Sequence, residues 1–330
     1  MRWMTYCLAA LSLTLWAAQP VFGRQENAKN AALLEAVRKN DADGVSREAA
    51  TGASPDARDK IGDTALVLAA RAGNPAVVNA LLKAKARPTL RSTYGKSPIV
   101  EAAANGHRDV VQLLVDSAVP VNTTDAEGTT PLIAAAARGD LDLIRFLLDR
   151  HAKVDEPDVT GATPLMRAAA MDRVEAIDLL LENHADMKKV DRFRRTALFY
   201  AASNARPAAA RELLKQRAET RVRDVDGLDA YQTVIETMAA GPNERIDDRL
   251  NTLRALQDRF RVDSRDGGGR TALMIAAERG VVPVIRYLLA LKPDINARDR
   301  SGRTALDWAE VKMHDEAAAV LKAAGAVSGG

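Results

Sequence analysis

The sequence predicts an all-α solenoid, in which similar helical repeats stack one upon the next. The main observation is a five-residue segment of the type Gly-x-Thr-Pro-Leu that recurs every 33 residues, as at Gly62, Gly95 and Gly128. A second observation is that aromatic residues make up only 4% of a chain that is 47% hydrophobic. A single deep core would use more large rings, because each ring buries so much apolar area. A stack of repeats needs only a thin, continuous core of small aliphatic side chains.

The first element along the chain is a predicted signal peptide over residues 1–23. Arg2 precedes an apolar run that ends at Ala18, and this run is too short to span a bilayer as a helix. Small residues follow the run, as they do at signal-peptide cleavage sites. We expect cleavage after Gly23. The alternatives are cleavage after Ala17 or Ala18, or retention of the segment as an uncleaved anchor.

Nine repeats are predicted to follow a short linker at 24–28 and to fill residues 29–326, before a C-terminal tail at 327–330. The terminal repeats act as caps, because the ends of a stack need a polar outer face. The repeats are predicted to start near Lys29, Gly62, Gly95, Gly128, Gly161, Arg194, Gly227, Gly269 and Gly302.

Each repeat is predicted to hold a turn and two antiparallel helices. The hydroxyl residue of the segment caps the first helix, because its oxygen can accept a bond from an orphan amide. A proline such as Pro131 then occupies the first helical position, where no N–H is needed. The second helix has apolar residues at i, i+3 and i+4, as in 141–148. The predicted caps are Thr64, Ser97, Thr130, Thr163, Thr196, Thr271 and Thr304.

These residues resemble the ankyrin-repeat family, whose unit is a β-turn followed by two antiparallel helices with a T-P-L-H-x-A signature. The signature is most complete at 130–135 and 163–168. The resemblance implies an ankyrin solenoid of stacked β-turn and helix-turn-helix units. It also implies that turn tips and first helices form a concave face that binds other proteins.

The sequence departs from the family pattern where the second helix ends. The usual glycine is present only in the terminal repeats, as Gly52 and Gly325. A left-handed residue other than glycine costs about 1 kcal/mol, unless the local geometry has changed. The internal replacements are Lys85, Ala118, His151, His184, Arg217 and Lys292.

The repeat that starts at Gly227 is nine residues longer than the others. We expect the additional residues in an enlarged turn between its two helices, at 239–248. One interpretation is a tolerated surface insertion, because a longer loop costs little entropy. The alternative is a loop that contacts a partner, or a hinge in the solenoid.

The sequence indicates no enzyme, cofactor or metal site. It contains no G-x-S-x-G, P-loop or H-E-x-x-H motif, and the repeats leave no room for a catalytic domain. His151 and His184 lie one repeat apart without a carboxylate or cysteine at ligand spacing. A ladder of aspartates precedes the repeats, and we interpret these residues as closing turns rather than binding calcium. They are Asp59, Asp125, Asp158, Asp191, Asp224, Asp266 and Asp299.

The charge and the cysteine content indicate which partners and which cellular compartment to expect. The net charge is +3 over 330 residues without a long basic run, so we expect no nucleic-acid partner. Cys7 is the only cysteine and lies in the predicted leader, so the mature chain relies on packing rather than disulfides. These features favour a bacterial envelope protein, periplasmic or alternatively extracellular. We expect a monomer without stable membrane insertion after cleavage.

The resemblance places candidate partner-binding residues on the concave face. An exposed aromatic or methionine beside arginine is typical of the centre of an interface. We therefore expect Tyr94, Met171, Arg192, Phe193 and Arg195 to contribute most. Isolated surface residues without a partner are the alternative. The candidates are Ile61, Arg71, Tyr94, Lys96, Arg138, Met171, Arg192, Phe193 and Arg195.

The sequence thus predicts an exported, non-enzymatic scaffold that binds a protein partner through the concave face of its repeats. Two alternatives remain within the interaction class. One is a secreted effector that acts on a host protein. The other is an accessory protein that supports a periplasmic enzyme, a role that the resemblance to bacterial ankyrin-like proteins implies.

Overall fold

The computed structural model describes residues 21–238 and 246–329. The predicted leader residues 1–20 lie outside this part of the chain, as do 239–245 of the expected enlarged turn. Over the described ranges the chain forms 18 α-helices and one short 3-10 helix, and no strand. The predicted all-α fold is confirmed. None of the described helices is long and apolar enough to cross a membrane.

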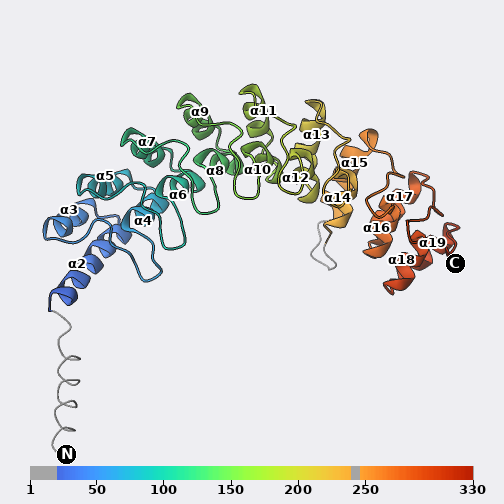
Figure 1. The fold of residues 1–330 in the computed structure, drawn as a ribbon, viewed down its shortest axis with the longest axis horizontal. Helices are drawn as coiled ribbons and strands as arrows, with labels where there is room; N and C mark the ends of the chain where they lie inside the picture. Colours follow the sequence, from blue (N-terminus) through green and yellow to red (C-terminus); the bar gives the residue numbers. More distant parts are fainter. Residues whose placement is uncertain (1–20, 239–245, 330) are drawn as a thin grey trace, which may run out of the picture. The chain divides into compact units, whose positions relative to one another are not determined.

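The chain divides into two compact units, Met1–Glu127 and Gly128–Gly330. In the first unit, helices pair within each repeat, and each helix also packs on its counterpart in the next repeat. Figure 1 shows the resulting two rows, one of first helices and one of second helices. The helices are α2 (Val21–Arg38), α3 (Ala42–Ala50), α4 (Ala65–Ala72), α5 (Pro75–Lys83), α6 (Pro98–Ala104) and α7 (Arg108–Asp116).

The second unit repeats this arrangement through six helix pairs. First helices are α8 (Pro131–Arg138), α10 (Pro164–Ala170), α12 (Ala197–Ser203), α14 (Ala230–Glu236), α16 (Ala272–Glu278) and α18 (Ala305–Val311). Second helices are α9 (Leu141–Asp149), α11 (Val174–Glu182), α13 (Pro207–Lys215), α15 (Ile246–Leu256), α17 (Val282–Ala290) and α19 (Asp315–Ala323). The 3-10 helix η1 (Gln257–Arg259) follows α15.

Two segments are helical where the sequence predicted irregular structure. Helix α2 runs through the expected linker at 24–28, which contains no helix-breaking proline or glycine. Helix α15 begins at Ile246, so the last three residues of the expected turn at 239–248 form its first turn. Asp247 and Asp248 favour this start, because acidic side chains stabilise the N-terminus of a helix.

The core combines leucine, isoleucine and valine side chains of both helix rows with pairs of alanines on the first helices. The side chains of these alanines are 0% exposed in both units, so small residues let the two helices of a repeat approach closely. This arrangement agrees with the thin core that the scarcity of aromatic residues predicts. The pairs are Ala69–Ala70, Ala102–Ala103, Ala135–Ala136, Ala168–Ala169, Ala201–Ala202 and Ala276–Ala277.

The predicted capping residues all occupy the N-cap position, but two of them make no cap bond. Thr64 and Thr130 accept a hydrogen bond from the amide three residues later at 3.1 Å, and Thr163, Thr271 and Thr304 do so at 3.4 Å. Ser97 and Thr196 have buried hydroxyls that find no partner among the described residues. Nothing in the structure explains why these two hydroxyls turn away.

The residues that end the second helices are in the left-handed region, although they are not glycine. Their φ angles lie between 54° and 72°. The backbone therefore keeps the left-handed conformation that glycine usually adopts at these helix ends, and the expected cost of placing another residue there remains. These residues are Lys85, Ala118, His151, His184, Arg217 and Lys292.

Candidate functional site

The aspartate ladder closes the turns that precede the first helices. In Asp158, Oδ1 accepts hydrogen bonds from Thr160 N at 2.8 Å and Ala162 N at 3.0 Å. The same pair of bonds, to the amides two and four residues later, confirms the turn-closing interpretation in most of the ladder. It occurs at Asp59, Asp158, Asp191, Asp224, Asp266 and Asp299.

Neighbouring turns are joined by backbone hydrogen bonds with N···O distances of 2.9 to 3.1 Å. Each bond runs from an amide of one turn to a carbonyl of the turn before it. The tips within a unit are therefore held at fixed positions relative to one another, and side chains at equivalent positions form a row. The donor and acceptor pairs are Thr93 and Gly62, Ala126 and Gly95, Arg192 and Thr160, Val225 and Phe193, Gly267 and Asp226, and Arg300 and Gly268.

In the first unit, the candidate residues divide into exposed apolar tips and paired cations. The side chains of Ile61 and Tyr94 are 60% and 69% exposed on successive turns. Arg71 on α4 bonds Asp63 at 2.8 Å and Glu101 on α6 at 2.7 Å, so it joins two repeats. Burial lowers the pKa of Arg71, but these hydrogen bonds outweigh it and raise the pKa above its usual value.

The other basic candidate of the first unit is also paired. Lys96 Nζ lies 3.6 Å from Glu127 Oε2. Arg71 and Lys96 therefore satisfy carboxylates of their own chain, although the sequence assigned both to a partner. Ile61 and Tyr94 remain the candidates of this unit whose side chains project freely.

In the second unit, three aromatic and basic candidates share one turn. Phe193 at the tip is 50% exposed, and the Arg195 guanidinium lies 4.8 Å from its ring centroid. Arg195 also lies 5.1 Å from the ring of Tyr200 and bonds the buried Asp191 carboxylate at 2.7 Å. Arg192 is the exposed residue beside Phe193. The contact with the Arg195 guanidinium favours one position of the Phe193 ring, because Asp191 and Tyr200 both hold the Arg195 side chain.

Hydrogen bonds in this cluster keep Arg195 and Tyr200 protonated. Burial lowers the pKa of Arg195, but hydrogen bonding to Asp191 outweighs it and raises the pKa above its usual value. Burial and the hydrogen bond to Asp191 both raise the pKa of Tyr200. Tyr200 therefore stays neutral and donates its hydroxyl to Asp191 Oδ2 at 2.9 Å.

Sequence reasoning missed Tyr200, although the repeat register contains a signal for it. The residue nine positions after a ladder aspartate bonds the second oxygen of that carboxylate in three repeats. Arg167 bonds Asp158 in this way. Tyr200 bonds Asp191, and Trp308 bonds Asp299, both at 2.9 Å. The position therefore faces the turn.

Two candidates lie on first helices rather than on turns. Arg138 is the last residue of α8, and Met171 follows α10 as its C-cap. They occupy equivalent positions in successive repeats, and Met171 is 47% exposed. Neither belongs to the Phe193 turn.

Toward the C-terminus, the first helices carry a chain of ion pairs that the sequence analysis did not identify. Arg279 bonds Glu236 at 2.8 Å, and Arg270 lies 3.9 Å from the same carboxylate. Arg270 also pairs with Glu278, which Lys312 approaches to 3.4 Å. The charges here satisfy one another, whereas the exposed Arg192 beside Phe193 makes no ion pair within the described residues.

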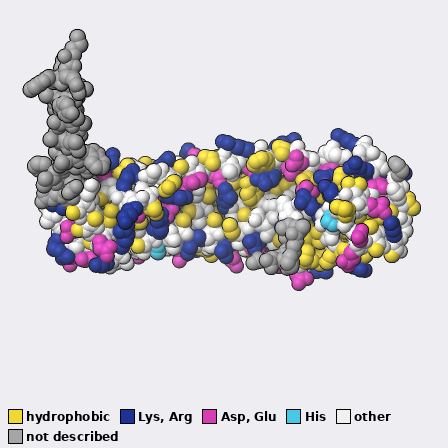
Figure 2. All heavy atoms as spheres, turned by 90° about the horizontal axis from the view of Figure 1, so that it is seen from below, with side chains coloured by type: hydrophobic (Ala, Val, Ile, Leu, Met, Phe, Trp, Pro, Cys, Tyr) yellow, Lys and Arg dark blue, Asp and Glu magenta, His cyan; other side chains and the backbone are white. Residues whose placement is uncertain are grey.

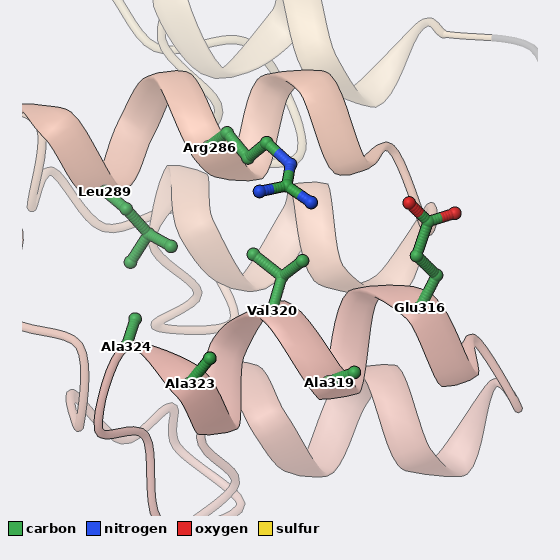
Figure 3. A pocket seen from close by; sticks show the side chains of 7 residues that line it. All are labelled: Arg286, Leu289, Glu316, Ala319, Val320, Ala323 and Ala324. Carbon is green, nitrogen blue, oxygen red and sulfur yellow. The ribbon is translucent and has the colours of Figure 1, made fainter.

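A groove of about 600 Å³ lies between α17 and α19. Figure 3 shows Arg286 and Leu289 on one helix opposite Glu316 and Val320 on the other. It is a gap between neighbouring second helices, which small side chains such as Ala323 leave open. None of the candidate residues lines it.

The surface shown in Figure 2 mixes basic, acidic and apolar side chains. This mixture differs from the single basic stripe that is typical of nucleic-acid binding. Over the described ranges, no group of three or more His, Cys, Asp or Glu side chains is placed to hold a metal ion.

Comparison with known proteins agrees with the geometry of the repeats. A family model described as ankyrin repeats (3 copies) matches residues 33–125, 112–191 and 238–327, which is more than half of the chain. A search of curated proteins found no match. Residues 192–237, between the second and third matches, include Arg194 and Asp229 in place of the usual glycine and threonine. The helix pairs, the linked turns and the family match together show that the chain belongs to the ankyrin-repeat family.

Proposed function

We propose that the protein is an exported, non-enzymatic scaffold that binds a protein partner through the turn tips and first helices of its repeats. Ankyrin repeats are in general protein–protein interaction modules. The observation that carries the proposal is the row of exposed apolar side chains on linked turns. Ile61 and Tyr94 form it in the first unit, and Phe193 occupies the equivalent position in the second, where Val159 and Val225 are exposed one residue earlier on their own turns.

The rigidity of these tips supports a binding role. Backbone hydrogen bonds connect the turns, and the contact with the Arg195 cation favours one position of the Phe193 ring. A surface that is ordered before binding loses little conformational entropy when a partner docks. Large rigid aromatic side chains are also typical of the few residues that dominate binding energy.

A comparative pull-down tests the proposal. Wild type, Tyr94→Ala, Phe193→Ala and the control Arg145→Ala are immobilised and exposed to envelope extract at near-physiological salt. Arg145 lies on α9 and is exposed. We expect one protein to be retained by wild type and the control, and lost from at least one tip variant. Equal retention by the wild type and all three variants, or no retention by wild type, would refute the proposal.

Export is the second part of the proposal and rests on the predicted leader at 1–23. Cell fractionation followed by N-terminal sequencing tests it. We expect the mature protein in the periplasm with Arg24 as its first residue. Cytoplasmic protein that still begins at Met1 would contradict export.

A further inference from the structure

One turn of the second unit has an arginine where seven other turns have glycine. Arg194 adopts a φ of 62°, and the glycines at the equivalent position have φ between 73° and 88°. These glycines are Gly62, Gly95, Gly128, Gly161, Gly227, Gly269 and Gly302. Arg194 lies within 192–237, which no copy of the family model matches.

The turn requires a left-handed residue at this place. Arg194 N bonds Asp191 O at 3.0 Å, and Asp191 N bonds Arg195 O at 3.1 Å. This is a β-turn followed by a bulge, in which the left-handed position is usually glycine. A Cβ added at Gly128 or Gly161 would come within 2.8 or 3.0 Å of the next turn's backbone. Arg194 is therefore strained in its turn.

Arg194 gains no internal partner that would compensate for this strain. Arg192 and Arg194 are exposed, and neither side chain makes an ion pair or hydrogen bond within the described part of the chain. Lys188, just before the turn, is also exposed, and its side chain makes no ion pair within the described residues. Lys85 and Lys292 are left-handed as well, so what distinguishes Arg194 is its place on a turn tip directly beside the exposed Phe193 ring.

The two arginines flank an exposed aromatic ring. Phe193 lies between them in sequence, and the Arg195 guanidinium, paired with Asp191, contacts one face of its ring. Guanidinium groups bind carboxylates through two parallel hydrogen bonds. The ring offers an apolar contact between two such sites.

The neighbouring turns favour a short acidic protein segment over a phosphate polymer. Val159 on the preceding turn and Val225 on the following turn, whose amide bonds Phe193 O, are exposed apolar residues next to this turn. The following turn also exposes Asp226, whose charge would repel a polyanion that continued along the row. A segment that presents carboxylates to a single turn avoids this repulsion.

We infer that the turn at 192–194 docks an acidic segment of the protein partner. Carboxylates of that segment pair with Arg192 and Arg194, and an apolar side chain between them packs on Phe193. The inference rests on the proposed scaffold function and adds the chemical class of the partner. It explains why this turn keeps an arginine where the fold favours glycine.

Peptide selection tests the inference on the mature protein. A random peptide library is selected on the wild type, and binding of a selected peptide is then measured by fluorescence anisotropy. We expect the selected peptides to be rich in Asp and Glu next to a large apolar residue. Arg194→Gly should weaken binding about tenfold, the size expected for one charge-assisted contact. The same change should raise the midpoint of thermal unfolding, because it relieves the strain.

Two variants provide the controls. Arg194→Lys keeps the charge and should retain part of the binding. Arg300→Gln changes an exposed arginine equivalent to Arg192 in the last turn, and should leave binding unchanged. If Arg194→Gly raises stability but weakens binding, Arg194 acts in binding. If Arg194 were instead a structural residue, its replacement would lower both stability and binding.

Three results would overturn the inference. They are selected peptides without acidic enrichment, equal binding by wild type and Arg194→Gly, and Arg194-dependent binding of an oligonucleotide or of anionic phospholipid vesicles. Each would leave the scaffold proposal standing as long as at least one of the tip variants Tyr94→Ala and Phe193→Ala loses the partner in the pull-down.

Discussion

Replacing Ala118 by glycine is expected to stabilise the protein, although the same change destabilises an ordinary helix. Ala118 follows α7 with a φ of 66° and is exposed, so the substitution removes only a strained methyl group. A left-handed L-residue costs about 1–2 kcal/mol. The additional freedom of glycine in the unfolded chain offsets about 0.4–1 kcal/mol of that gain. The net gain is therefore expected to be about 0.5–1 kcal/mol.

Urea unfolding of the mature protein, followed by circular dichroism, measures this gain. Ala319→Gly is the matched control, because Ala319 is exposed in the middle of α19. The control should lose about 1 kcal/mol, since glycine is a poor helix former. The two identical chemical changes should thus have opposite signs. A loss of stability in Ala118→Gly would refute the strain argument, and with it the interpretation of the other left-handed helix ends.

Three further predictions concern polar groups. Ser97→Ala should change the free energy of unfolding by less than about 0.5 kcal/mol, because the hydroxyl has no bond to lose, whereas Thr130→Ala should cost about 1 kcal/mol. Asp191→Ala should cost about 3 kcal/mol in thermal or urea unfolding, because it leaves a half-buried guanidinium and a buried phenol unpaired. Partial burial raises the pKa of Asp307, but hydrogen bonds from Ser328 and two backbone amides outweigh it and lower the pKa to about 2. The ionised carboxylate contributes its full share to the free energy of unfolding above about pH 4, and this share is lost as the pH falls toward 2. The free energies of unfolding of wild type and Asp307→Asn should therefore become more alike in acid.

Each of these predictions has a clear contradiction. Equal costs for Ser97→Ala and Thr130→Ala would mean that the Ser97 hydroxyl does cap its helix. A neutral Asp191→Ala would show that the carboxylate does not organise its turn. A difference between wild type and Asp307→Asn that stays constant from pH 7 to about pH 2 would contradict the lowered pKa.

The sequence predicts those structural features that recur with the 33-residue repeat. The capping position of Thr130 and the burial of Ala135 follow from the 33-residue register, because local geometry and packing recur with it. The left-handed state of Ala118 follows in the same way.

Contacts between side chains of different repeats could not be predicted, because they depend on reach and rotamer. Arg71 bonds Glu101 on the next first helix, so its charge is not free for a partner. Helix α15 is held by Arg249, which donates to Ser203 O and Thr237 Oγ1 at 2.9 Å. No periodic signal marks that arginine, since it lies in the one enlarged repeat.

Site-specific photocrosslinking tests most directly the claim that the turn tips bind a protein. A photoreactive phenylalanine analogue replaces Tyr94, Phe193 or, as a control on a second helix, Arg145, and the cells are irradiated before lysis. We predict that a single protein is crosslinked from at least one of the two tip positions, Tyr94 and Phe193, and not from Arg145. Crosslinks to that protein from Arg145 alone, or equally from all three positions, would contradict it.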